Sequence, residues 1–207
     1  GVIDVPLYPT ISASEYEYIL NDAEVKYAFV GGGDSYDKVL EAQKNVPSLK
    51  GIFTMDRQEG RPYWKDMWKE DRIEEVKTMS ESIKSDQLAT LIYTSGTTGN
   101  PKGVMLTHDN IAHVTYVSAG ALPLAPGEAV LSFLPLCHIF ERAASYSFAY
   151  KGTSIYYTGT DNLGGDTGDL KSVKPSYFNT VPRLLEKVYA AIYNKGLELS
   201  GAKKKLF

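Results

Sequence analysis

Residues 93–103 combine glycines, hydroxyl side chains and one lysine in a pattern suited to phosphate binding. They read Tyr-Thr-Ser-Gly-Thr-Thr-Gly-Asn-Pro-Lys-Gly and follow an apolar stretch at residues 88–92. Glycine allows positive φ and close approach of backbone N–H groups to an anion, while hydroxyl groups donate to phosphate oxygens and Lys102 adds a full positive charge. A second apolar stretch at residues 104–106 predicts a hairpin-like clamp around the loop. The expected ligand is a nucleotide.

The loop differs from a Walker A loop at two positions that the mechanism of that loop requires. Counting from Gly96, Pro101 stands where the second glycine is needed, and Gly103 follows Lys102 where a metal-binding hydroxyl is needed. A plain surface turn rich in glycine, serine and threonine is the other alternative. The strand patterns on both sides and the lysine between proline and glycine favour phosphate binding.

The composition is typical of a globular protein. The chain has 207 residues, of which 43% are hydrophobic and 23% are charged. Its net charge of −3 gives no general attraction to nucleic acid. No apolar run approaches the roughly 18 residues of a transmembrane helix. The single cysteine, Cys137, rules out an internal disulfide and fits a reducing compartment. We expect a cytoplasmic protein whose membrane contact is limited to the periphery of the inner membrane surface.

Strand-like and helix-like segments alternate along the chain, which predicts βαβ units and an α/β fold. The expected strands lie at residues 2–8, 27–30, 52–55, 89–93, 129–133, 154–157 and 177–181. The expected helices lie at residues 13–21, 36–45, 62–77, 109–121, 140–151 and 182–199. Ser12 and Glu15 form a capping-box pattern, and Pro182 suits a first helical position. We expect one layered, largely parallel β-sheet with helices on both faces, and residues 80–86 are the best place for a subdivision.

Several segments resemble a known family. The loop resembles, nearly letter for letter, the signature Thr/Ser-Ser/Thr-Gly-Thr-Thr-Gly-x-Pro-Lys-Gly of the adenylate-forming superfamily. Residues 134–142, which read Leu-Pro-Leu-Cys-His-Ile-Phe-Glu-Arg, resemble a segment that long-chain acyl-CoA synthetases carry between a core strand and a helix. Residues 5–10 and 181–187 resemble other stretches of that branch. The resemblance spans essentially the whole chain and implies a long-chain fatty acid–CoA ligase.

The reaction that the resemblance implies has two steps. A fatty carboxylate attacks the α-phosphate of ATP to give an acyl-adenylate and pyrophosphate, and the thiol of coenzyme A then displaces AMP. The resemblance implies that the β- and γ-phosphates are held by the loop residues Thr94, Ser95, Gly96, Thr97, Thr98, Gly99 and Lys102. Thr94 or Thr98 would also contact Mg²⁺, which prefers oxygen ligands.

His138 is the candidate catalytic residue. It follows the strand expected at residues 129–133, and parallel sheets place ligands beyond the carboxyl ends of their strands. In the family, a residue of this segment lines the acyl-adenylate pocket. A partly buried histidine that donates to a carbonyl is the structural alternative. A nucleophilic pair of Cys137 and His138 is rejected because consecutive residues of an extended chain point to opposite faces. Glu141 and Arg142 are expected to form a structural pair.

Two features of the family are absent from this sequence. One is the Tyr-Gly-x-Thr-Glu segment, whose glutamate helps to bind Mg²⁺, and the other is the C-terminal domain that carries the catalytic lysine. Residues 167–169 imitate the ribose-binding Thr-Gly-Asp but stand too early in the chain. We therefore expect residues 1–207 to be an incomplete N-terminal AMP-binding domain that is inactive alone. The alternatives are a non-catalytic nucleotide- or acyl-binding module and an enzyme that adenylates another carboxylate.

Overall fold

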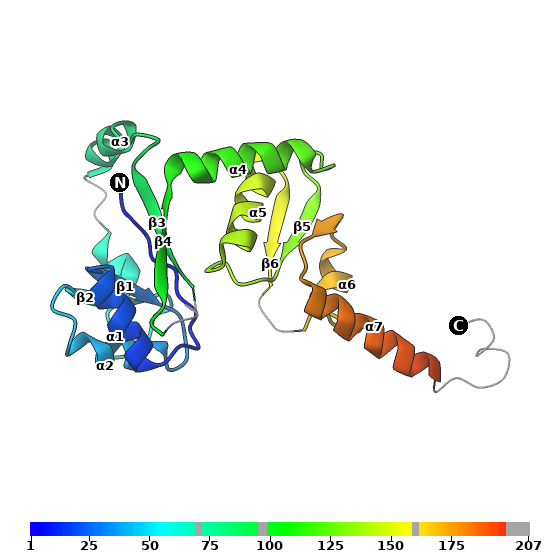
Figure 1. Ribbon diagram of the computed structural model, residues 1–207, viewed down its shortest axis with the longest axis horizontal. Coiled ribbons are helices and arrows are strands. Elements are labelled where there is room, and N and C mark those ends of the chain that lie inside the picture. Colours follow the sequence, from blue (N-terminus) through cyan, green and yellow to red (C-terminus); the bar gives the residue numbers. More distant parts are fainter. Residues whose placement is uncertain (69–71, 95–98, 159–161, 198–207) are drawn as a thin grey trace. The chain divides into compact units, whose positions relative to one another are not determined.

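Figure 1 shows the computed structural model of the chain, which describes residues 1–68, 72–94, 99–158 and 162–197. The chain divides into two compact units. Unit 1 contains residues 1–120 and 135–143, and unit 2 contains residues 121–134 and those from 144 onward. Both units combine helices with strands, and parallel strand pairs occur in each. The predicted α/β class is therefore confirmed.

The first part of unit 1 is a parallel pair of strands packed against two helices. Its elements are α1 (Ala13–Asp22), β1 (Tyr27–Val30), α2 (Ser35–Gln43) and β2 (Gly51–Thr54). β1 and β2 pair in parallel, with Tyr27 opposite Gly51. The buried side chains that form their common core are Tyr16, Leu20, Val30, Val39, Ala42, Val46, Leu49 and Ile52. After β2 follow a short 3-10 helix η1 (Trp64–Met67) and helix α3 (Ile73–Glu81).

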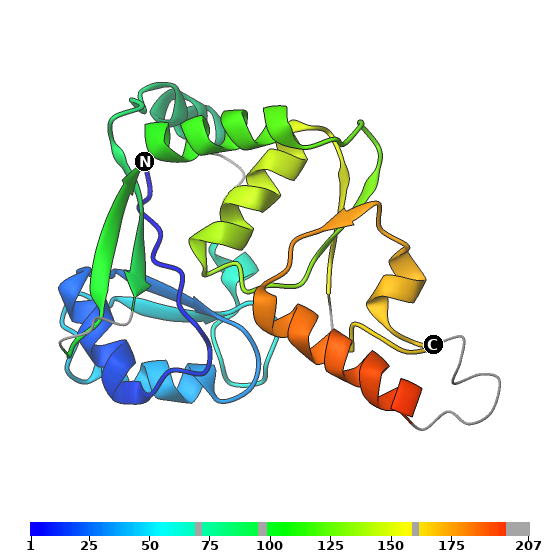
Figure 2. The same ribbon diagram turned by 45° about the vertical axis from the view of Figure 1, so that its right-hand side comes forward.

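The second part of unit 1 is an antiparallel hairpin. It consists of β3 (Leu88–Thr94) and β4 (Lys102–Thr107), and helix α4 (His108–Ala121) follows directly. The N-terminal segment runs alongside the hairpin in Figures 1 and 2, and Asp4 forms an isolated parallel bridge with Thr90 of β3. This arrangement confirms the hairpin that the two apolar stretches predict.

Unit 2 is built on a three-stranded parallel sheet. Its strands are β5 (Ala129–Ser132), β6 (Ser154–Tyr157) and β7 (Tyr177–Phe178), in the order β6-β5-β7 (Figure 1). Its helices are α6 (Asp169–Val173), α7 (Pro182–Leu197) and the part of α5 (Ile139–Tyr150) that follows residue 143. Val130 of β5, Phe148 of α5 and Leu124 form the buried core. None of the helices in the described ranges is long and apolar enough to cross a membrane.

Local signals in the sequence predict where two helices begin. The hydroxyl of Ser12 accepts a hydrogen bond from the backbone N–H of Glu15 at 3.2 Å, and the Glu15 carboxylate accepts one from the N–H of Ser12 at 2.9 Å. The predicted capping box is thus confirmed. α7 begins at Pro182, as predicted, because that position needs no backbone donor.

Two element predictions are wrong. The helix expected at residues 62–77 is replaced by η1 and α3, and Tyr63 and Trp68 on either side of η1 are extended. The cause is tertiary: the indole N–H of Trp64 donates to the carbonyl of Met55 at 3.0 Å, and the Pro62 carbonyl accepts from the N–H of Thr54 at 2.8 Å. The strand expected at residues 2–8 is reduced to one bridge.

The described residues also do not form the single large sheet that the sequence predicts. Their strands fall into three small sheets, two with parallel pairing and one, the β3–β4 hairpin, with antiparallel pairing. The sequence pattern of alternating elements predicts the parallel pairs correctly. It does not reveal that the hairpin of β3 and β4 forms a sheet of its own, apart from the parallel strands.

Candidate phosphate-binding site

The β3–β4 hairpin holds the two ends of the glycine-rich loop together. Thr94, the last residue of β3, is directly opposite Lys102, the first residue of β4. In an antiparallel pair, side chains that are directly opposite lie on the same face and about 4.5–5.5 Å apart at Cβ. The hydroxyl of Thr94 and the ammonium of Lys102 therefore belong to one face of the hairpin, and both residues are exposed.

Lys102 carries the charge of this site. No ion pair joins its ammonium to another side chain in the part of the chain that the structure describes. An exposed lysine at the base of a loop of glycines and hydroxyl groups is available to an anionic ligand. Four predicted contacts, Ser95, Gly96, Thr97 and Thr98, lie outside the described residues.

Gly99 is the predicted glycine whose conformation is described. Its φ of +126° lies in the region that residues with a side chain rarely adopt. An added Cβ at this position would meet no atom of the described residues within 4 Å. Backbone conformation, not lack of space, therefore requires glycine here. Positive φ is what the pattern of glycines in this segment predicts.

Tyr93 and Gly103 form the opposite face of the hairpin, because side chains alternate along a strand. They are directly opposite, and an added Cβ on Gly103 would lie 3.0 Å from Cζ of Tyr93. The Tyr93 hydroxyl donates to the Asp22 carboxylate at 2.5 Å. Burial, together with Asp22, raises the pKa of Tyr93 above its ordinary value, so the phenol keeps its proton and this bond. The contact ties the loop end of the hairpin to the last residue of α1.

Sequence reasoning missed the contact between Tyr93 and Asp22. The only local signal is that Tyr93 stands opposite Gly103. A glycine at that position leaves room for the ring to lie over the partner strand, but this signal is weak. The partner carboxylate is 71 residues earlier in the chain, so no local pattern identifies it.

His138 lies in the turn before α5 and is exposed. Its N–H donates to the Pro135 carbonyl at 3.0 Å, and its own carbonyl accepts from the N–H of Arg142 at 3.2 Å. No hydrogen bond of its ring to a described residue is present, whereas the structural alternative expects a partly buried ring that donates to a carbonyl. The rings of His138 and Tyr8 are arranged edge to face. Their centroids are 6.1 Å apart and their planes are inclined at 79°.

The placement of His138 differs from the sequence expectation in one respect. The strand before it, β5, belongs to the sheet of unit 2, whereas Thr94 belongs to the β3–β4 hairpin of unit 1. The two strands therefore do not share one sheet edge, as expected from a single parallel sheet. His138 itself is part of unit 1, together with Thr94 and Lys102.

Cys137 makes its contact with Tyr8, from the N-terminal segment. The Tyr8 hydroxyl is hydrogen-bonded to the thiol, and burial raises the pKa of both groups, which keeps both protonated near neutral pH. A protonated, half-buried thiol paired with a phenol is not an activated nucleophile. This agrees with the rejection of a Cys137 and His138 pair.

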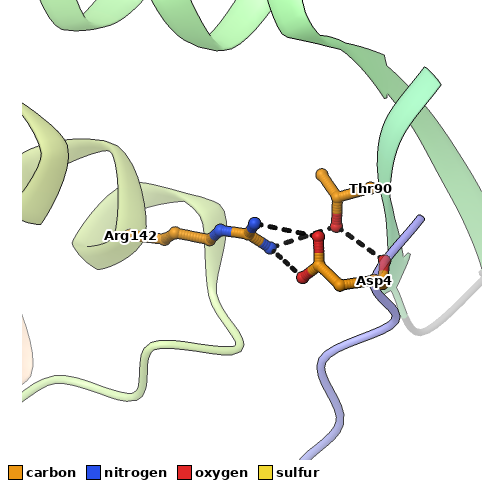
Figure 3. A network of polar contacts seen from close by, with 3 residues as sticks. All are labelled: Asp4, Thr90 and Arg142. Atoms are coloured by element: carbon orange, nitrogen blue, oxygen red, sulfur yellow. Dashed lines mark hydrogen bonds and ion pairs between the residues drawn. The ribbon is translucent and has the colours of Figure 1, made fainter. Parts of the chain in front are cut away.

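Arg142 binds the carboxylate of Asp4 (Figure 3), while its expected pairing with Glu141 stays a prediction. The two guanidinium nitrogens meet the two carboxylate oxygens at 2.6 and 3.0 Å, and one of them also donates to the Thr90 hydroxyl at 3.1 Å. Asp4 and Arg142 are 138 residues apart in the chain, which is why sequence reasoning missed the pair. The bidentate geometry joins the first turns of α5 to β3.

A magnesium ion fits this site only in part. The described residues include no group of three His, Cys, Asp or Glu side chains that could hold a metal. The exposed hydroxyl of Thr94 is one oxygen ligand of the kind that Mg²⁺ accepts. Mg²⁺ in nucleotide sites usually keeps several waters and binds substrate phosphates, so one protein hydroxyl at the mouth of the loop is compatible with that mode. Thr98, the other candidate, is not described.

Comparison with known proteins identifies the family. Residues 1–206 match the family described as AMP-binding enzyme. The human long-chain-fatty-acid–CoA ligase ACSBG2 is 34% identical over 218 residues, which cover 100% of this chain and 33% of the human protein. The peroxisomal long chain acyl-CoA synthetase 6 of Arabidopsis thaliana is 31% identical over 99% of this chain and 30% of its own length. The chain thus spans about a third of the length of these relatives.

Solved structures share the fold at lower identity. A long-chain-fatty-acid CoA ligase from Rhodopseudomonas palustris, named in its description as putative, has a TM-score of 0.73 and 17% identity, covering 91% of this chain and 46% of the other. A red-emitting luciferase from Phrixothrix hirtus has a TM-score of 0.65 and 18% identity, covering 86% of this chain and 35% of the luciferase chain. The family match extends over nearly all of the 207 residues, and the hairpin and its loop lie within it. The chain belongs to the family of AMP-binding enzymes.

Proposed function

We propose that the chain is part of an ATP-dependent long-chain fatty acid–CoA ligase. The observation that supports this most directly is the hairpin itself, which places Thr94 and Lys102 on one face at the two ends of a loop of glycines and hydroxyl groups. The curated relatives named as long-chain ligases support the choice of carboxylate. Because the chain spans about a third of their length, we propose that it forms part of an N-terminal AMP-binding domain.

In this function the loop neutralises and orients the phosphates of ATP. The fatty carboxylate attacks the α-phosphorus, the bond to the bridging oxygen breaks, and pyrophosphate leaves. Lys102 and the backbone N–H groups around Gly99 stabilise the negative charge that spreads over the leaving group. Mg²⁺, held in part by the hydroxyl of Thr94 or Thr98, would add positive charge at the β- and γ-phosphates. In the second step the thiol of coenzyme A attacks the acyl carbon and AMP leaves.

The location is part of the same proposal. Half-buried Cys137 is the chain's single cysteine, and it fits a reducing, cytoplasmic compartment. A fatty substrate partitions into lipid, so we propose that contact with the inner membrane surface is peripheral.

Pyrophosphate exchange with the intact enzyme tests the proposal. We expect radiolabelled pyrophosphate to enter ATP only when a long-chain fatty acid is present, and thioester to form only when coenzyme A is added. Exchange that depends on an amino acid or an aromatic acid instead would show an enzyme for another carboxylate. Binding of ATP without exchange for any carboxylate would show a non-catalytic module.

His138 gives a second prediction for the same assay. Because its ring is exposed and makes no hydrogen bond to a described side chain, His138→Ala should slow adenylate formation while leaving the melting temperature nearly unchanged. The matched control is His113→Ala, at a histidine of α4 that is also exposed. Normal exchange together with a large loss of thermal stability would show that His138 is structural.

A further inference from the structure

Asp4, the first residue of the N-terminal segment Asp4–Tyr8, is hydrogen-bonded to β3. The N–H of Asp4 donates to the Ala89 carbonyl at 3.3 Å, and the Asp4 carbonyl accepts from the N–H of Leu91 at 3.0 Å. The Thr90 hydroxyl donates to the same carbonyl at 2.9 Å. Three backbone-directed bonds therefore fix Asp4 on the strand that ends at Thr94.

The side chain of Asp4 extends this connection to α5. Its carboxylate binds the Arg142 guanidinium at 2.6 and 3.0 Å, and the Arg142 side chain is only 14% exposed (Figure 3). A bidentate pair of this kind holds the plane of the guanidinium as well as its position. The N–H of Arg142 is bonded to the carbonyl of His138, one helical turn earlier. Fixing Arg142 therefore fixes the backbone of His138.

The other end of the segment reaches the His138 side chain. The Tyr8 ring lies against the imidazole, and its hydroxyl is hydrogen-bonded to the Cys137 thiol. Tyr8 is itself held, because its carbonyl accepts from the hydroxyl of Tyr16, a buried residue of α1, at 3.3 Å. The backbone of Tyr8 is thus tied to the core of α1 and α2, and its ring faces His138.

We propose that the segment Asp4–Tyr8 is a positioning strap that holds His138 in a fixed place relative to the strand leading into the phosphate-binding loop. The inference rests on the proposed function. Asp4 sets the backbone of His138 through Arg142, and Tyr8 sets its ring. Asp4, Tyr8 and Arg142 act as positioning residues and do not touch the substrate. The exposed His138 ring makes its aromatic contact with Tyr8, so a strap that holds Tyr8 in place prepares the imidazole for the adenylate.

Variants of the intact enzyme test the strap through pyrophosphate exchange. Asp4→Asn weakens the ion pair with Arg142 but keeps the backbone hydrogen bonds to β3. Tyr8→Leu removes the aromatic ring that contacts His138. We expect each to lower kcat about 10- to 100-fold with little change in the KM for ATP, because misplacement of a catalytic group acts on the transition state. Tyr8→Phe keeps the ring and should retain most of the activity.

A matched control separates positioning from stability. Asp37→Asn cuts a similar pair, in which one nitrogen of Arg61 meets the two Asp37 oxygens at 2.9 and 3.1 Å on the surface of unit 1. Rates are compared per folded molecule, measured by circular dichroism. We expect Asp37→Asn to keep the wild-type kcat. An equal loss of kcat in Asp37→Asn and Asp4→Asn would overturn the proposal.

Histidine NMR supplies a readout that does not depend on activity. The ring resonances of His138, assigned by their loss in His138→Gln, should move in Tyr8→Leu and in Asp4→Asn and stay in place in Tyr8→Phe and Asp37→Asn. If the wild-type enzyme showed no exchange with any carboxylate, the proposed function would fail while this measurement still tested the strap. Unchanged His138 resonances in both Tyr8→Leu and Asp4→Asn would show that the strap does not hold the ring.

Discussion

Replacement of Lys102 by alanine is expected to slow acyl-adenylate formation about 10- to 150-fold in the intact enzyme. The factor follows from the loss of one charge-assisted contact, worth about 1.5–3 kcal/mol. The structure supports a change confined to the site, because the Lys102 side chain is exposed and forms no ion pair within the described part of the chain. The hairpin should therefore keep its register. Pyrophosphate exchange and a thermal melt are the two measurements.

The control for this variant is Lys84→Ala, which removes an exposed lysine four residues before β3 begins. It changes the net charge by the same amount without touching the loop. We expect wild-type exchange from Lys84→Ala. Wild-type exchange from Lys102→Ala as well would mean that the loop does not hold the phosphates of ATP through its lysine.

The second large effect is expected at Gly99. Any side chain at φ +126° costs on the order of 1–3 kcal/mol of backbone strain. The backbone at this position would therefore change its conformation, or keep it and be destabilised. Since no atom of the described residues lies within 4 Å of an added Cβ, Gly99→Ala should lower adenylation nearly as much as Gly99→Val. We expect losses comparable to that of Lys102→Ala, again measured by pyrophosphate exchange.

Gly120→Ala is the matched control for the glycine. Its added Cβ also meets nothing within 4 Å, but this glycine lies in α4 and has no positive φ. We expect unchanged exchange and an equal or slightly higher melting temperature, because alanine favours the helix. A steep decline from Gly99→Ala to Gly99→Val would point to crowding instead of backbone strain and would contradict the account of this position.

Features that depend on neighbours in sequence could be predicted. The capping box of Ser12 and Glu15, the start of α7 at Pro182 and the hairpin around the loop each follow from residues only a few positions apart. The same holds for the glycine requirement at Gly99, since the glycine pattern itself predicts a positive φ there.

Features that depend on distant contacts could not be predicted. The helix expected at residues 62–77 gives way to η1 because Trp64 finds a hydrogen bond to Met55, and such contacts override helical propensity. The bonds of Asp4 to Arg142 and of Tyr93 to Asp22 join residues 138 and 71 positions apart. No periodicity or spacing encodes either pair, yet they hold the two candidate site segments in place.

Transfer of an oxygen isotope tests the central claim most directly. A fatty acid labelled with ¹⁸O in its carboxyl group, ATP and coenzyme A are incubated with the intact enzyme, and the nucleotide product is examined by mass spectrometry. If the carboxylate attacks the α-phosphorus and the thiol later breaks the bond between the acyl carbon and that oxygen, the AMP that leaves must carry one ¹⁸O. We predict singly labelled AMP and unlabelled pyrophosphate. Label in inorganic phosphate with ADP as the nucleotide product would show attack at the γ-phosphorus and would contradict adenylation at this loop.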